Sequence, residues 1–96
     1  MKKITLFGSP LWPGCHPVRE VLLNHNIPFQ YIDITDSMKN LKIFLSFRDK
    51  DPYFESIKKK GSVGIPVIMI GNGDAFYEAT PEIDLSLISK SYWLLG

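Results

Sequence analysis

The chain of 96 residues has a single cysteine, Cys15. One cysteine excludes an internal disulfide framework, and it excludes a zinc site built from several thiolates of the same chain. It also excludes a reaction cycle that needs two thiols in one molecule. The fold must therefore be stabilised by its hydrophobic core, and any thiol chemistry must go through Cys15.

The sequence also lacks a long apolar run and a strong charge of either sign. No stretch approaches the roughly 18 apolar residues that cross a bilayer, and the run from Ile4 to Phe7 is shorter than the roughly 7 to 15 residues of a signal peptide core. With 11 basic and 10 acidic residues, the formal net charge is only +1. No field of that size attracts nucleic acid or a membrane surface. We therefore expect a cytoplasmic protein without nucleic-acid or membrane partners, in a compartment where a free thiol persists.

Apolar periodicity predicts the elements of one domain, residues 1–96, without repeats or linkers. Short β-branched and aromatic runs predict strands at 3–7, 29–34, 67–70 and 75–77. Helical spacing predicts helices at 18–25 and 38–49 and further turns at 53–60, and Thr80 with Pro81 predicts the start of a last helix. The pair Asn72-Gly73 predicts a hairpin turn in which both residues take positive φ.

The order of these elements indicates an α/β fold. A strand, a helix and a second strand of this length imply a right-handed parallel crossover. The uninterrupted apolar run from Val67 to Ile70 is typical of a central strand covered on both faces. We predict a thioredoxin-like fold: a four-stranded mixed sheet in the order β-α-β-α-β-β-α, with an antiparallel edge hairpin and helices on both faces.

Four features in fixed order make the chain similar to a known family. They are the turn holding Pro13 and Cys15, the pair Ile27-Pro28 before the second strand, the segment Gly64-Ile65-Pro66 before the third, and the short hairpin. Over nearly its whole length the chain resembles the glutaredoxins, above all bacterial glutaredoxin-related proteins with an extended second helix. The resemblance implies a thiol–disulfide oxidoreductase, a protein thiol or glutathione as partner, and no resident cofactor or metal.

The resemblance leaves two registers for the active-site motif. Glutaredoxins open their first helix with Cys-Pro-x-Cys, in which the first cysteine attacks and the second resolves. Counting back from Pro28 places Trp12-Pro13-Gly14-Cys15 on this motif, so Cys15 takes the resolving position one turn into the helix and faces inward. In the alternative register Cys15 is the attacking residue at the helix N-terminus, and His16 beside it lowers its pKa.

Two functions follow from the resemblance. The first is single-cysteine redox chemistry with Cys15 as candidate catalytic residue, set in an active-site loop made of Trp12, Pro13, Gly14 and His16. The alternative is a redox-inactive binding module that uses the groove beside Trp12 and Ile65-Pro66. The resemblance implies that Pro66 is a cis-proline and that Ile65 offers its backbone to an extended peptide or glutathione. Thr80, at the start of the last helix, is the third predicted groove residue.

The glutathione site that the resemblance implies is altered in this chain. Where family members have Gly-Gly-x-Asp-Asp, the chain has Glu78-Ala79-Thr80-Pro81-Glu82, which adds an acid and removes a backbone donor. Ser9 stands where many relatives place a lysine. Both changes weaken recognition of a tripeptide with two carboxylates. Monothiol glutaredoxins that hold iron–sulfur clusters keep the first cysteine, so no such cluster is expected with Trp12 in its place.

Several interpretations stay open at this point. Cys15 is either a reactive thiol or a small buried apolar residue, and Trp12 either contacts partners at the rim or covers Cys15. The spacing of Cys15 and Arg19 is similar to that of thioredoxin-fold arsenate reductases, although these need arginines beyond Arg19 and Arg48. The apolar tail from Tyr92 to Leu95 either pairs protomers in a weak dimer or completes the core of a monomer.

Overall fold

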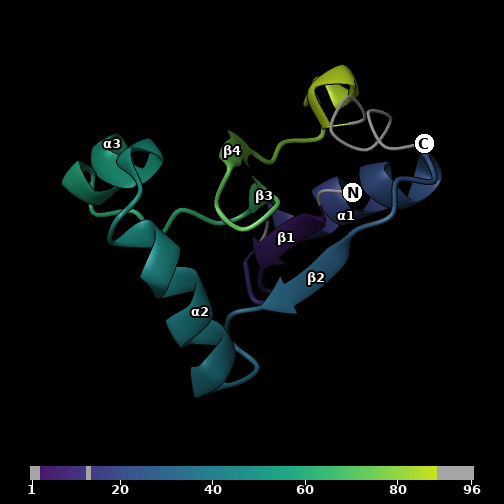
Figure 1. The fold of residues 1–96 in the computed structure, drawn as a ribbon. Helices are drawn as coiled ribbons and strands as arrows, with labels where there is room; N and C mark the ends of the chain where they lie inside the picture. The colour runs from purple at the N-terminus through teal and green to yellow at the C-terminus, as the bar shows by residue number, and fades with distance from the viewer. Residues whose placement is uncertain (1–2, 13, 89–96) are drawn as a thin grey trace.

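Four short strands and three helices follow one another along the chain in the computed structural model, which describes residues 3–12 and 14–88 (Figure 1). Residues 85–88 form a further helical turn. Pro13 and the tail from Tyr92 to Leu95 lie outside the described residues. The elements are β1 (Ile4–Gly8), α1 (Cys15–Asn24), β2 (Gln30–Asp33), α2 (Met38–Arg48), the 3-10 turn η1 (Pro52–Phe54), α3 (Glu55–Lys59), β3 (Val67–Ile70) and β4 (Ala75–Glu78).

The sheet has the strand order β2-β1-β3-β4. Strand β2 pairs parallel to β1, as the predicted crossover requires, and β4 pairs antiparallel to β3 as the predicted hairpin. The pairing of β3 with β1 is also antiparallel, which residue patterns did not indicate. Strand β3 lies inside the sheet with all four residues buried, so the interpretation of its apolar run is confirmed.

Helices cover both faces of the sheet, as predicted (Figure 1). Side chains of a strand alternate between faces, so Leu6 and Ile68 pack with Val18 and Leu22 of α1. On the opposite face, Phe7 and neighbouring side chains pack with those of α2 and η1, and the residues of this second cluster are Phe7, Ile34, Phe44, Phe54, Val67, Met69 and Phe76. No helix in the described part of the chain is long and apolar enough to span a membrane.

Local hydrogen bonds set where the helices begin. Helix α2 begins after Ser37, whose side chain accepts a hydrogen bond from the Asn40 amide. The prediction that Thr80 caps the last helix is wrong. Its carbonyl closes only a single turn to Ile83, and the helix begins at residue 85 because the Asp84 carboxylate accepts from the amide and hydroxyl of Ser86.

The hairpin between β3 and β4 has the predicted place but not the predicted backbone. Positive φ falls on Gly71 (63°) and Gly73 (86°), and not on Asn72. The Asp74 amide donates to the Ile70 carbonyl at 3.0 Å, so the connection is a four-residue turn. Glycine rather than asparagine therefore carries the strained conformation of this turn.

Candidate functional site

The loop after β1 brings Cys15 to the beginning of α1. The Trp12 amide donates to the Ser9 carbonyl at 3.1 Å, and the Cys15 amide donates to the Trp12 carbonyl at 3.2 Å. The hydroxyls of Ser9 and Thr35 hydrogen-bond at 2.8 Å, which ties the loop to the end of β2. Residues 10–12 form a turn, and Cys15 is the first residue of α1. The prediction that Cys15 lies one turn into the helix is therefore wrong.

The Cys15 thiol nevertheless faces inward, since only 3% of the residue is exposed. Its Sγ accepts a hydrogen bond from the Ser9 amide at 3.3 Å. It also lies against Gly8, where an added Cβ would be 3.0 Å from Sγ. Burial raises the pKa of Cys15 and the Asp33 carboxylate adds to the effect, while the hydrogen bond from Ser9 opposes it. At neutral pH the group is therefore a thiol and not a thiolate.

His16 does not activate this thiol. Its side chain is 80% exposed and its Nε2 lies 3.8 Å from the Glu20 carboxylate, one helical turn along. It is not among the groups that shift the pKa of Cys15. The expectation that His16 lowers the pKa of Cys15 in the alternative register is therefore wrong.

Arg19, the arginine nearest to Cys15 in the sequence, packs its guanidinium against an aromatic ring. The Arg19 guanidinium lies 4.7 Å from the centre of the Tyr31 ring, a cation–π contact. Burial raises the pKa of Tyr31, and Cys15 and Asp33 raise it further against the opposing effect of Arg19. Arg48, the other arginine, binds backbone carbonyls far from Cys15 along the chain. Both guanidiniums therefore have partners other than the Cys15 thiol.

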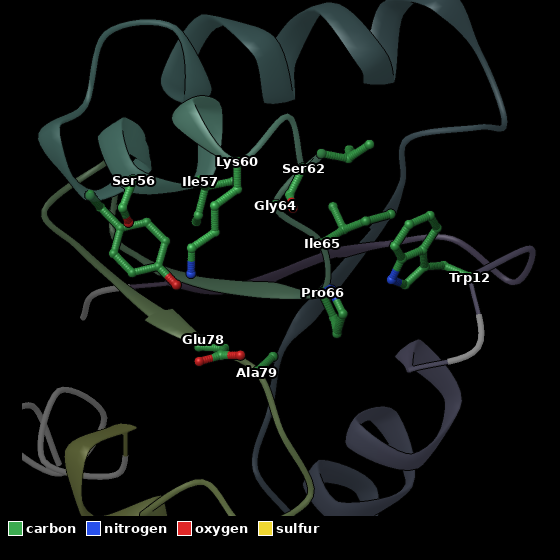
Figure 2. Close-up of a pocket in the computed structure, with 12 residues that line it drawn as sticks. Trp12, Ser56, Ile57, Lys60, Ser62, Gly64, Ile65, Pro66, Glu78 and Ala79 are labelled. Carbon is green, nitrogen blue, oxygen red and sulfur yellow. The ribbon is translucent and has the colours of Figure 1, made fainter.

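A pocket of about 460 Å³ opens beside the loop and not at the thiol. Figure 2 shows Trp12 pointing toward Ile65 and Pro66 from one side, and Lys60 reaching in from the other. The lining residues are Trp12, Tyr53, Ser56, Ile57, Lys60, Ser62, Val63, Gly64, Ile65, Pro66, Glu78 and Ala79. Cys15 is not among them, so the structure separates the predicted groove from the predicted catalytic sulfur.

Three of the groove residues named from the sequence line the pocket: Trp12, Ile65 and Pro66. The Ile65–Pro66 peptide bond is cis, and Gly14 lies against Pro66, where an added Cβ would be 3.8 Å from the proline Cδ. Trp12 is 46% exposed at the rim. Thr80 does not line the pocket, because the chain turns away after Ala79.

Comparison with known proteins gives the family. The glutaredoxin family model matches residues 4–75, from β1 to the first residue of β4. The chain belongs to the glutaredoxin family. A protein of Haemophilus influenzae described as uncharacterised is 32% identical over 74 residues, which cover 77% of this chain and 86% of the relative. No solved structure matches. Membership of the glutaredoxin family, together with the mixed sheet, confirms the predicted thioredoxin-like fold.

Sequence reasoning missed three polar residues that line the pocket of this glutaredoxin: Tyr53, Lys60 and Glu78. Burial raises the pKa of Tyr53 and the nearby Glu78 carboxylate adds to the effect. Lys60 ends a basic run of the kind that is usually solvated. The available signal was position, since Tyr53 lies on η1, Lys60 directly follows α3 and Glu78 ends β4, and these elements flank the segment entering β3. Among residues 3–12 and 14–88, no three His, Cys, Asp or Glu side chains form a group that would hold a metal.

The raised pKa predicts slow alkylation of Cys15. With iodoacetamide at pH 7.5, we expect the native protein to react at least about tenfold more slowly than free cysteine, with a half-point above that of free cysteine, because only the thiolate attacks. The rate is read by mass spectrometry against pH, and unfolding in urea serves as the control that restores the ordinary rate. A half-point at or below that of free cysteine would contradict burial as the dominant cause.

Proposed function

We propose that this glutaredoxin-family domain is a binding module that holds an extended peptide in the groove beside Trp12 and Ile65-Pro66, without disulfide turnover through Cys15. One observation carries the proposal. The pocket opens onto Trp12 and Pro66, whereas the Cys15 sulfur is buried against Gly8 with a raised pKa. A ligand in the groove therefore meets an indole where a redox glutaredoxin presents its attacking thiol.

The backbone of Ile65 supports an extended ligand. Within the described residues neither its amide nor its carbonyl makes a hydrogen bond, whereas the adjacent Pro66 carbonyl accepts from the Ala79 amide at 3.3 Å. Backbone polar groups that have no partner within the protein are satisfied by water or by a bound extended peptide. A peptide paired to Ile65 would lay its side chains alternately toward the Trp12 indole and the solvent.

The charges of the groove favour a peptide with neutral ends over glutathione. Glu78 places a carboxylate in the lining, and Lys60 supplies the only cation among the lining residues. Glutathione brings two carboxylates and one amine, so one carboxylate is left without a cationic partner. Exposed charges of this kind are each worth less than about 1 kcal/mol. The preference for a neutral peptide is therefore expected to be modest.

Binding is tested by titrating the ¹⁵N-labelled protein with two probes that are unable to exchange disulfides. These are a pentapeptide with blocked ends and a central S-methylcysteine, and S-methylglutathione. We expect shifts of the Ile65 amide and the Trp12 indole with both, and roughly threefold tighter binding of the blocked peptide at low salt. Trp12→Ala weakens binding, whereas Leu23→Ala, which removes a comparably exposed side chain from α1, does not. Absence of shifts at Ile65 would sink the proposal.

Single-cysteine exchange is the second candidate, favoured by the place of Cys15 at the N-terminus of α1 and by the hydrogen bond from the Ser9 amide to its sulfur. In that reaction the Cys15 thiolate attacks one sulfur of glutathione disulfide, a mixed disulfide forms, and one glutathione thiolate leaves. Incubation of the native protein with glutathione disulfide, followed by mass spectrometry, separates the two functions. The binding module stays unmodified while native, and the exchange enzyme gains one glutathione. In either case a cytoplasmic location is part of the proposal.

A further inference from the structure

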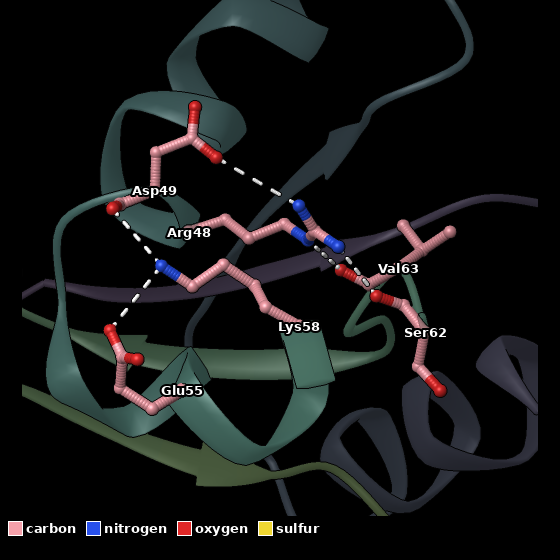
Figure 3. A network of polar contacts seen from close by, with 6 residues as sticks. All are labelled: Arg48, Asp49, Glu55, Lys58, Ser62 and Val63. Carbon is pink, nitrogen blue, oxygen red and sulfur yellow. Dashed lines mark hydrogen bonds and ion pairs between the residues drawn. The ribbon is translucent and has the colours of Figure 1, made fainter. Parts of the chain in front are cut away.

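One wall of the groove is the segment of residues 62–65. It is held by the side chain of Arg48, which does not line the pocket. Arg48, the last residue of α2, donates from Nε to the Val63 carbonyl at 2.7 Å and from Nη2 to the Ser62 carbonyl at 2.6 Å (Figure 3). Ser62 and Val63 both line the pocket, and Arg48 does not. A guanidinium donates two hydrogen bonds in a fixed fork, so it fixes two consecutive carbonyls at once.

The wall segment has little else to hold its middle. Residues 62–65 are in neither a helix nor a strand. The segment is anchored at its first residue by the Ser62 amide, which donates to the Ile57 carbonyl at 3.0 Å. It is anchored again at Gly64, whose φ of +102° disfavours a side chain and where an added Cβ would lie only 3.2 Å from the Phe54 ring. Between these anchors, the two carbonyls bound by Arg48 set the path of the wall toward Ile65.

Arg48 lies where polar contacts of Asp49 and Lys58 join the end of α2 to α3, and Lys58 makes none of its contacts with Arg48 itself. Its Nη1 lies 3.8 Å from the Asp49 carboxylate, and its side chain is only 20% exposed. The Asp49 carbonyl accepts from Lys58 Nζ at 3.2 Å, and Lys58 pairs with Glu55 at 3.4 Å (Figure 3). Arg48 therefore contacts the wall from the end of α2, at the place where α2 and α3 are joined.

We infer that Arg48 is a positioning residue for the groove: it holds the carbonyls of Ser62 and Val63 so that the backbone of Ile65 is presented to the bound peptide. The inference rests on the proposed function for its ligand. Its geometric part, the hold on the wall, is measured without any ligand. Arg48 touches no ligand itself and acts only through the segment it binds.

The test compares four full-length proteins: wild type, Arg48→Ala, Arg48→Lys and Lys58→Ala. The last variant removes a cation from the same network without touching the wall carbonyls, so it is the matched control. Hydrogen exchange is read at the Ser62 amide, which is protected by its hydrogen bond to the Ile57 carbonyl, and affinity is read by titration with the blocked pentapeptide. In Arg48→Ala we expect exchange at Ser62 to speed up by about tenfold and affinity to fall by about tenfold, as for the loss of a hydrogen bond to a charged group.

Arg48→Lys is expected to fall between wild type and Arg48→Ala, since an ammonium keeps the charge but not the fork. Lys58→Ala should match wild type in exchange at Ser62 and in affinity. Unchanged exchange at Ser62 in Arg48→Ala overturns the inference, and so does unchanged affinity when wild type binds. If wild type binds neither probe while exchange still accelerates in Arg48→Ala alone, the proposed function fails and the hold of Arg48 on the wall stands.

Discussion

Replacing Phe54 with alanine is expected to lower the free energy of unfolding by about 3–5 kcal/mol, the usual cost of deleting a buried aromatic ring. Phe54 is fully buried. Its ring lies 4.9 Å from that of Tyr53, 5.1 Å from that of Phe76 and 5.9 Å from that of Phe44, measured between centroids. These neighbours come from three different elements, so no single movement refills the space. Urea denaturation followed by circular dichroism measures the loss.

Phe54→Leu is the matched control, and it should cost less than about 1.5 kcal/mol because it keeps most of the apolar volume. The same ring supports Gly64, so Phe54→Ala should also loosen the wall of the groove. Faster hydrogen exchange at the Ser62 amide under native conditions would show this. A loss of stability below about 1 kcal/mol would mean that the second core cluster reorganises around the missing ring.

Trp12→Cys is expected to create a redox-active dithiol. The Cys15 amide donates to the Trp12 carbonyl, so residues 12 and 15 are the ends of a turn whose Cα atoms are within about 7 Å. That separation is compatible with a disulfide. Trp12 is 46% exposed beside Pro66, so a thiol there should alkylate at least about a hundredfold faster than the buried Cys15. With glutathione disulfide, the two thiols should form one internal disulfide and release two molecules of glutathione.

The internal disulfide is measured as the loss of two hydrogen masses and its reversal by dithiothreitol. Trp12→Cys combined with Cys15→Ala keeps the exposed thiol and should stop at the mixed disulfide with glutathione. Trp12→Ala should show neither product. Persistent failure of the single variant to close the disulfide would argue for the alternative register, in which Cys15 itself is the attacking residue.

The two predictions address different parts of the molecule. The cluster around Phe54 supports the groove, and the turn from Trp12 to Cys15 decides whether the groove has a thiol. In this chain the groove is open beside Trp12 and Pro66, while the Cys15 sulfur is buried and does not line it. Stability of the scaffold and chemistry at the thiol are therefore expected to vary independently under mutation.

The sequence by itself determined the family and most of the fold. The apolar run of β3 marks a fully buried strand, and the alternation of strands and helices predicts the parallel crossover. These inferences succeed because apolar periodicity and turn residues are local properties of the chain. The start of the last helix was predicted wrongly for the same reason. Thr80 and Asp84 are both good N-cap residues, and only packing selects between them.

The tertiary structure alone decided the nature of the site. The pKa of Cys15 depends on burial against Gly8 and on Asp33, neither of which spacing around the cysteine reveals. The groove gathers side chains from β4, α3 and the loop before α1, and Arg48 reaches it from α2. Contacts between residues far apart in the chain leave no periodic signal in the sequence. The sequence therefore identified the cysteine, and the fold decided that its sulfur is buried and does not line the groove.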